Sequence, residues 1–274
     1  MRAERRAGAV GPRGYPAAVP RTVLATRYVA PLREGGSVPA LVEADDLGLY
    51  VVKLHGAAQG SKALVAELVV GGLVAALGEA RPDLGLHVPE VVLVDLPREL
   101  SIAEPDPEIQ DHLKASAGLN VGLDFLPRAL PYTTAAGPQP SPELAAAVVW
   151  IDALCENVDR TPRNPNLLTW HDRLWLIDHG AARYRHHAGL DPAKAQGRFP
   201  AIRDHVLLPR AGSIADADAA LAPLVTEELV GRLVAAVPQA WLPPDEAALH
   251  AEDLWARASG PRAFVEEAER ARTA

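Results

Sequence analysis

Five polar residues in separate parts of the chain have the types and the order that one kind of chemistry requires. Lys53 lies within an apolar, strand-like run, and Glu67 follows it in a helix-like segment. Asp159 and Asn164 share a proline-rich turn, and Asp178 ends a later apolar run. Phosphoryl transfer needs a cation for the phosphates, oxygen ligands for magnesium and a carboxylate that orients the attacking hydroxyl. The five residues supply all three.

The local sequence around these residues predicts how they could meet. A lysine in a strand is held rigidly, and a helix that folds back over that strand would bring Glu67 to Lys53 and orient its ammonium. Asn164 and Asp178 are expected at adjacent ends of a hairpin, where two oxygen ligands can converge on a hard cation. The sequence therefore predicts one nucleotide and metal site built from distant segments.

The first part of the chain is rich in predicted strands. Residues 40–43 and 49–54 form an expected hairpin around a turn of Asp, Asp, Leu and Gly at residues 45–48. A helix is predicted to begin at Ser61, which is a suitable N-cap, and its leucines recur at near-helical spacing. Gly71 and Gly72 weaken that helix, which indicates close packing against a neighbour. Further strands are predicted at residues 88–96 and 121–126.

The second part of the chain is mainly helical. The predicted order is a loop at 131–142, a helix at 142–157, the turn of 159–166, a hairpin at 167–177 and amphipathic helices over 219–274. Trp241 and Trp255 are expected to anchor these helices in the core. A strand-rich part followed by a helical part predicts an α+β fold of two lobes, with any ligand between them. The expected divisions are a disordered basic tail at 1–20, an N-terminal lobe at 21–126 and a C-terminal lobe at 127–274.

Composition limits the partners and the compartment. The formal charge of −8 predicts repulsion from nucleic acids and from anionic membranes. The first 20 residues lack the continuous apolar segment of a secretory signal, and the most apolar run, residues 68–77, is about half of the ~20 residues that span a bilayer. We therefore expect a cytoplasmic protein without a membrane span. Cys155 is the only cysteine, so no intramolecular disulfide can form, and its apolar helix predicts a small core residue.

The segments DRTPRNPNLL at residues 159–168 and LIDHG at residues 176–180 resemble the HipA-like kinases and, more distantly, the phosphatidylinositol kinases. The resemblance implies a two-lobed protein-kinase-like fold that uses ATP and Mg²⁺. It implies that Lys53 contacts the nucleotide phosphates and pairs with Glu67, that Asp159 is the catalytic carboxylate, and that Asn164 and Asp178 hold magnesium. It also implies an interlobe hinge that presents backbone groups to adenine, formed by Asp124, Phe125 and Leu126. A short turn that covers the phosphates would be formed by Gly35, Gly36 and Ser37.

The same resemblance suggests an acceptor and shows where this chain departs from common kinases. Val158 stands where many kinases have a histidine, and His179 stands where they have a phenylalanine, which is similar to the atypical kinases. The expected acceptor is a protein Ser or Thr hydroxyl, and Ser37 is a candidate for autophosphorylation. Arg160 and Arg163 are expected to add positive charge near the phosphates.

Three alternatives stay open at this point. Residues 56–62 and 91–95 could form a P-loop and a Walker B strand, although the glycine spacing is one residue short and the serine precedes the lysine. A metal site could be formed by His179, His186, His187 and Asp191, which lack helical ligand spacing. The protein could also bind nucleotide without transferring phosphate, as a pseudokinase or regulatory partner. Retention of the residues for transfer argues against that last reading.

Overall fold

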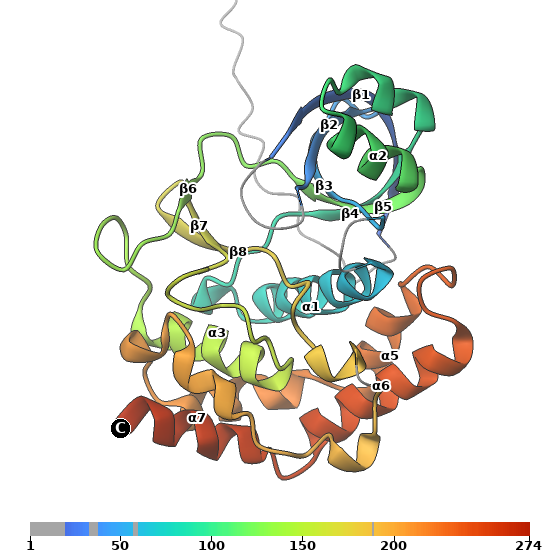
Figure 1. The fold of residues 1–274 in the computed structure, drawn as a ribbon. Helices are drawn as coiled ribbons and strands as arrows, with labels where there is room; N and C mark the ends of the chain where they lie inside the picture. Colours follow the sequence, from blue (N-terminus) through green and yellow to red (C-terminus); the bar gives the residue numbers. More distant parts are fainter. Residues whose placement is uncertain (1–19, 33–37, 57–59, 188) are drawn as a thin grey trace, which may run out of the picture.

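A computed structural model describes residues 20–32, 38–56, 60–187 and 189–274. The fold is mixed α+β, with a strand-rich N-terminal region and a helical C-terminal region, as predicted (Figure 1). Of the predicted basic tail at residues 1–20, only Pro20 lies within the described residues.

The N-terminal region is a closed barrel of five strands. Its strands are β1 (Thr22–Pro31), β2 (Ala40–Ala44), β3 (Leu49–Lys53), β4 (Val91–Leu96) and β5 (Gly118–Asp124), arranged in the order β1-β2-β3-β5-β4. The β2–β3 pairing is antiparallel with Ala40 opposite Val52, which confirms the predicted hairpin. The barrel closes because β1 pairs in parallel with β4. The sequence pattern had predicted no strand at β1.

The barrel encloses a core of its own. Valines from three strands point inward and are fully buried, among them Val42, Val52 and Val92. The short helix α2 (Pro107–Ala115) packs Ile109 and Leu113 against this core. The barrel thus forms a rigid frame that holds β3 and its terminal lysine in place.

Helix α1 (Gly60–Ala80) lies between the barrel and the C-terminal helices (Figure 1). A Cβ on Gly71 would approach Val91 Cγ2 of β4 to 3.3 Å, and a Cβ on Gly72 would approach Leu233 Cδ2 of the C-terminal helices to 2.6 Å. The predicted close packing at both glycines is confirmed. Within the described residues, α1 is the one helix long and apolar enough to cross a membrane, and 72% of its most apolar window is buried inside the protein. Such burial is typical of a core helix.

The C-terminal region has a buried helix at its centre. The central helix α3 (Pro142–Leu154) is capped by Ser141, whose side chain accepts a hydrogen bond from the amide of Leu144 at 3.1 Å, and it is buried from Leu144 onward. Helices α4 (Ile214–Leu221) and α7 (Ala263–Thr273) pack against α3, whereas α5 (Glu227–Ala235) packs against α1 and α6 (Pro244–Ser259). Short 3₁₀ turns occur at Pro82–Leu84, Arg98–Ala103, Tyr184–His187, Pro192–Lys194, Pro200–Asp204, Leu208–Arg210 and Ala222–Leu224.

A small antiparallel sheet joins the two regions. It consists of β6 (Leu130–Pro131), β7 (Leu167–Trp170) and β8 (Arg173–Leu176), in that order. The predicted hairpin at residues 167–177 is therefore confirmed, with β6 as a third strand. The prediction that Trp241 and Trp255 anchor the core is wrong, because both are only partly buried at its edge. The fully buried tryptophan is Trp150, at the centre of α3.

Candidate active site

Lys53 joins three elements that are far apart in the sequence. Its ammonium lies at the end of β3, 2.7 Å from Glu67 Oε2 on α1 and 2.5 Å from Asp178 Oδ1 in the connection after β8. The expected contact between Lys53 and Glu67 is thus present. The Glu67 side chain is fully buried, whereas the Asp178 side chain is 44% exposed. One lysine therefore links a buried anchor to a carboxylate that solvent or a ligand can reach.

The charges of this trio depend on one another. Burial alone would lower the pKa of Lys53, but the Glu67 and Asp178 carboxylates outweigh burial and raise it, so the ammonium stays charged. Burial would raise the pKa of Asp178, yet Lys53 holds it below its ordinary value. Burial raises the pKa of Glu67, and Lys53 opposes this, as does the His179 amide that donates to Glu67 Oε2 at 2.7 Å. Asp178 is consequently the ionised, accessible carboxylate.

The predicted turn brings Asp159 and Asn164 into contact. Asp159 Oδ2 accepts hydrogen bonds from Asn164 Nδ2 at 2.7 Å and from Asn166 Nδ2 at 3.1 Å. A carboxylate can only accept, so the amide nitrogens of both asparagines must face it. The oxygen of Asn164, which is the atom a hard cation would bind, is left for other partners.

Asn166, which the sequence did not single out, connects this turn to Asp178. Its carbonyl accepts the Ile177 amide at 3.1 Å, one residue before Asp178. Asn166 and Asp178 both have left-handed backbone, with φ of 48° and 54°. Such conformations are uncommon outside glycine, although Asn and Asp adopt them more readily than most residues, and they cluster at functional sites. The turn and the end of β8 thus form one unit that carries both acidic residues.

Arg160 corrects one expectation. Its guanidinium is buried and bonds only to protein atoms among the described residues, including Asp152 Oδ2 at 2.5 Å. A guanidinium engaged in this way is not available to bind a phosphate directly. Arg163 is exposed, and its role stays a prediction.

The predicted adenine hinge lies within the described residues, whereas the predicted phosphate-covering turn does not. The amides of Asp124 and Phe125 donate to the carbonyls of Glu90 and Leu49, at 2.8 and 2.9 Å, so these two amides already have partners within the protein, and the role of the two residues in binding adenine stays a prediction. The Leu126 amide stays a prediction for that role. The phosphate-covering turn of Gly35, Gly36 and Ser37 lies outside the described residues.

The competing P-loop reading finds little support. Lys62, its lysine, donates to the carbonyl of His186 at 2.9 Å, and Gly56 donates its amide to Ser116 Oγ at 3.0 Å. Residues 57–59 of the loop lie outside the described residues. Asp95 is an exposed residue of β4 in the barrel.

Among the side chains that the structure describes, neither the histidines nor the cysteine forms a second site. Among the described side chains, which do not include that of His187, no group of three His, Cys, Asp or Glu residues is arranged to hold a metal. His179 is fully buried, and burial is the main cause that lowers its pKa to about 3. Burial raises the pKa of the Cys155 thiol to about 12, as expected for an unreactive core cysteine.

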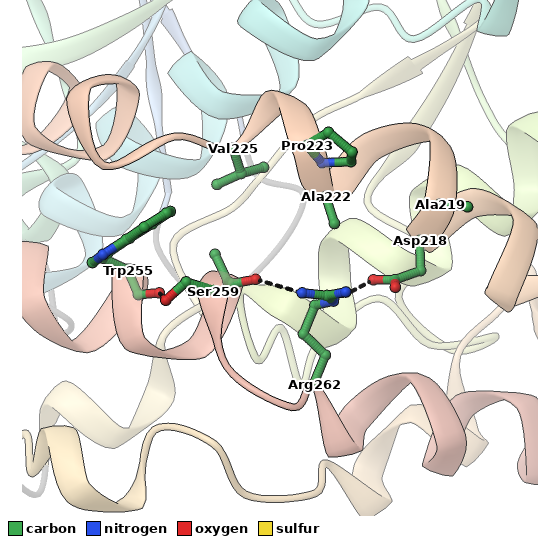
Figure 2. A pocket seen from close by; sticks show the side chains of 9 residues that line it. Asp218, Ala219, Ala222, Pro223, Val225, Trp255, Ser259 and Arg262 are labelled. Carbon is green, nitrogen blue, oxygen red and sulfur yellow. Dashed lines mark hydrogen bonds and ion pairs between the residues drawn. The ribbon is translucent and has the colours of Figure 1, made fainter.

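A cavity of about 250 Å³ lies away from these residues, between α4, α6 and the start of α7 (Figure 2). The charged residues that line it pair with each other, because Arg262 Nε donates to Asp218 Oδ1 at 2.8 Å. The same oxygen also accepts a hydrogen bond from the Trp150 indole at 2.8 Å. The cavity shares no residue with the Lys53 trio or the Asp159 turn. It is therefore not the candidate active site.

Comparison with protein families gives a match over most of the chain. The family model of the HipA-like kinases matches residues 26–257, which is most of the chain and includes β3, α1, the Asp159 turn and Asp178. No curated protein and no solved structure matched. On the extent of this match, the chain belongs to the HipA-like kinase family.

Proposed function

We propose that the protein is an ATP-dependent kinase that transfers the γ-phosphate to a hydroxyl group, with a protein Ser or Thr as the acceptor. The observation that carries the proposal is the contact of one ammonium, Lys53, with both Glu67 and Asp178. A charged, fixed lysine beside an accessible ionised carboxylate suits a metal-bound triphosphate. Family membership supports kinase activity in general.

The fold supports a nucleotide site between two lobes of a protein-kinase-like arrangement. The barrel and α1 would belong to an N-terminal lobe of residues 21–126, and the helical region to a C-terminal lobe of residues 127–274. The trio lies where the barrel, α1 and the end of β8 meet. ATP placed there would have its adenine near Leu126 and its phosphates near Lys53.

The residues present fit a magnesium ion. Magnesium is usually held by one or two carboxylates together with substrate phosphates and water. Asp178 supplies an ionised carboxylate of which only Oδ1 contacts Lys53, and Asn164 supplies an amide oxygen. When bound, the ion would neutralise phosphate charge.

The chain's own residues then have distinct tasks. Lys53 binds phosphate oxygens through its ammonium, and Glu67 keeps that ammonium in place. Asp159 accepts both asparagine bonds through Oδ2, so Oδ1 is the oxygen that would orient an acceptor hydroxyl. Because phosphoryl transfer depends mainly on positioning and charge, these are the tasks that the chain's own residues must perform.

Transfer of label from γ-³²P-ATP to casein and to the protein itself tests the proposal. Wild type with Mg²⁺ should label protein, and Asp159→Asn or excess EDTA should prevent it. Binding of ATP without any labelling would favour the pseudokinase or regulatory partner. Mass spectrometry of the self-labelled protein tests whether Ser37 is the modified residue.

A further inference from the structure

The guanidinium of Arg160 contacts both segments that carry the acidic residues of the candidate site. It donates to the carbonyl of Asn166 and, at 3.3 Å, to the carbonyl of Ile177. Its Nη2 also lies 3.2 Å from His179 Nδ1. Ile177 and His179 flank Asp178 on either side.

The same segments lead directly to Asp159. Asn166, whose carbonyl Arg160 binds, holds Asp159 Oδ2 through its side-chain amide at 3.1 Å, and Arg160 itself follows Asp159 in the chain. The arginine thus reaches the backbone next to each acidic residue without touching either carboxylate in the bonds described. Its burial, at 1% exposed, leaves it no access to a ligand.

Asp152 on α3 fixes the arginine from behind. This fully buried carboxylate accepts Arg160 Nε at 2.5 Å, Asn157 Nδ2 at 3.0 Å and His205 Nε2 at 2.9 Å. His205 Nδ1 accepts the Leu207 amide at 3.1 Å, so its hydrogen is on Nε2 and it serves Asp152 as a donor. Arg160 is therefore anchored to α3, a helix that is buried from Leu144 onward.

We infer that Arg160 is a positioning residue, which, anchored by Asp152, sets the placement of Asp159 relative to Asp178. The catalytic consequence rests on the proposed function, because only phosphoryl transfer requires those two carboxylates at a fixed separation. The planar guanidinium of arginine is needed for this task, because its nitrogens donate to several acceptors in fixed directions. A lysine ammonium, in contrast, is a single point charge.

Arg160→Lys is the informative change, because it keeps the charge that Asp152 needs and removes the planar guanidinium. The matched control is Arg257→Lys. Arg257 is equally buried and its guanidinium also binds backbone carbonyls, those of Ala153, Leu154, Ala195 and Gly197, but it has no described bond to the Asp159 turn or the end of β8.

Two measurements on the full chain test the role. Hydrogen exchange without nucleotide should become at least about tenfold faster in peptides covering residues 164–167 and 176–180 of Arg160→Lys, and should not change there in Arg257→Lys. ATP turnover, followed as ADP release per folded molecule with Mg²⁺, should fall about 100-fold in kcat for Arg160→Lys, with KM for ATP within about threefold. Arg257→Lys should retain the wild-type kcat.

The outcomes separate the two proposals. Equal exchange in the two lysine variants, or equal loss of kcat in both, overturns the positioning role. A wild-type protein without ATP turnover or transfer refutes the proposed function, while the exchange measurement still decides whether Arg160 orders the two segments. If Arg160→Lys does not fold, Asp152→Asn gives the same test, and unchanged exchange at residues 164–167 and 176–180 in that variant counts against the role.

Discussion

Lys53 Nζ lies 2.5 Å from Asp178 Oδ1, although the two residues belong to different parts of the fold. β3 supplies the lysine and the connection after β8 supplies the aspartate. The contact couples the barrel to the C-terminal region through a charge that is mostly shielded from solvent, with the lysine side chain 12% exposed. A change that breaks this pair should therefore affect both the candidate site and the placement of the barrel relative to the C-terminal region.

Asp178→Asn should reduce phosphate transfer by about 10³-fold or more, because the amide cannot supply the charge that a metal ion needs. The backbone should be unaffected, since asparagine tolerates the left-handed conformation at φ 54°. The control is Asp172→Asn, an exposed turn residue with φ 60°. Radiolabel transfer should be normal in the control. Full activity of Asp178→Asn would remove this residue from the mechanism.

Lys53→Met should lower the free energy of unfolding by about 3 kcal/mol, because it leaves Glu67 as a buried carboxylate without its cation. Glu67→Gln should cost less, since Lys53 keeps Asp178 as its partner. The double variant should be more stable than the sum of the two losses predicts. Urea unfolding of the four proteins gives the coupling, and strict additivity would show that the pair is energetically independent.

Gly122→Ala should destabilise the barrel by about 1–3 kcal/mol, because overpacking forces neighbouring side chains to move. The new methyl group would lie 2.5 Å from Val94 Cγ2 and 3.0 Å from Val92 Cγ2. Gly231→Ala on α5 is the matched control, since nothing lies within 4 Å of its Cβ position. The control should gain about 0.5–1 kcal/mol from helix propensity. Thermal unfolding of both variants measures the difference, and equal shifts would contradict a tightly filled barrel.

Stability should fall as the pH falls from about 6.5 towards about 4, and His250 should contribute to this loss. Burial, followed by the charges of Arg183 and Lys62, lowers the pKa of this histidine to about 4, and the ring of His186 lies 5.4 Å away. A histidine with a lowered folded pKa contributes its stability above the unfolded pKa and loses it on acidification.

His250→Gln should therefore flatten the pH profile by an amount on the order of 2 kcal/mol, allowing for partial solvent screening. Chemical unfolding at several pH values between 4 and 7 measures it. His171→Asn, at an exposed turn, should keep the wild-type profile. An unchanged slope in His250→Gln would show that other groups cause the acid sensitivity.

Local sequence signals were sufficient where residue type alone decides the structure. The β2–β3 hairpin and the turn of Asp159 follow from turn and apolar patterns, whereas Ser61, the predicted N-cap, lies inside α1, which begins at Gly60. β1 escaped notice because Leu24 and Val29 are exposed, which hides its alternation, and because β4, its partner on the side opposite β2, lies far along the chain. Strand pairing of this kind has no local signature.

Charged residues were harder to place than apolar ones. Arg160 lies in a turn of prolines and asparagines, where an arginine is usually solvated. Its burial depends on Asp152, which reaches it from α3 at the end of a helix that otherwise reads as apolar. The α2 helix carried a usable signal, since Asp106 accepts the Glu108 amide and Pro107 begins the first turn, but it spans nine residues only.

The two adjacent glycines of α1 bear on how activity could be controlled. Gly71 packs closely against Val91 and Gly72 against Leu233, so α1 cannot rotate or shift outward without moving these neighbours. A shift of α1 that moves Glu67 away from Lys53 would therefore disrupt the hydrophobic core that both regions share. The contact between Lys53 and Glu67 is thus tied to the packing of α1, so a regulatory change that breaks it through a movement of this helix would also have to disturb that packing.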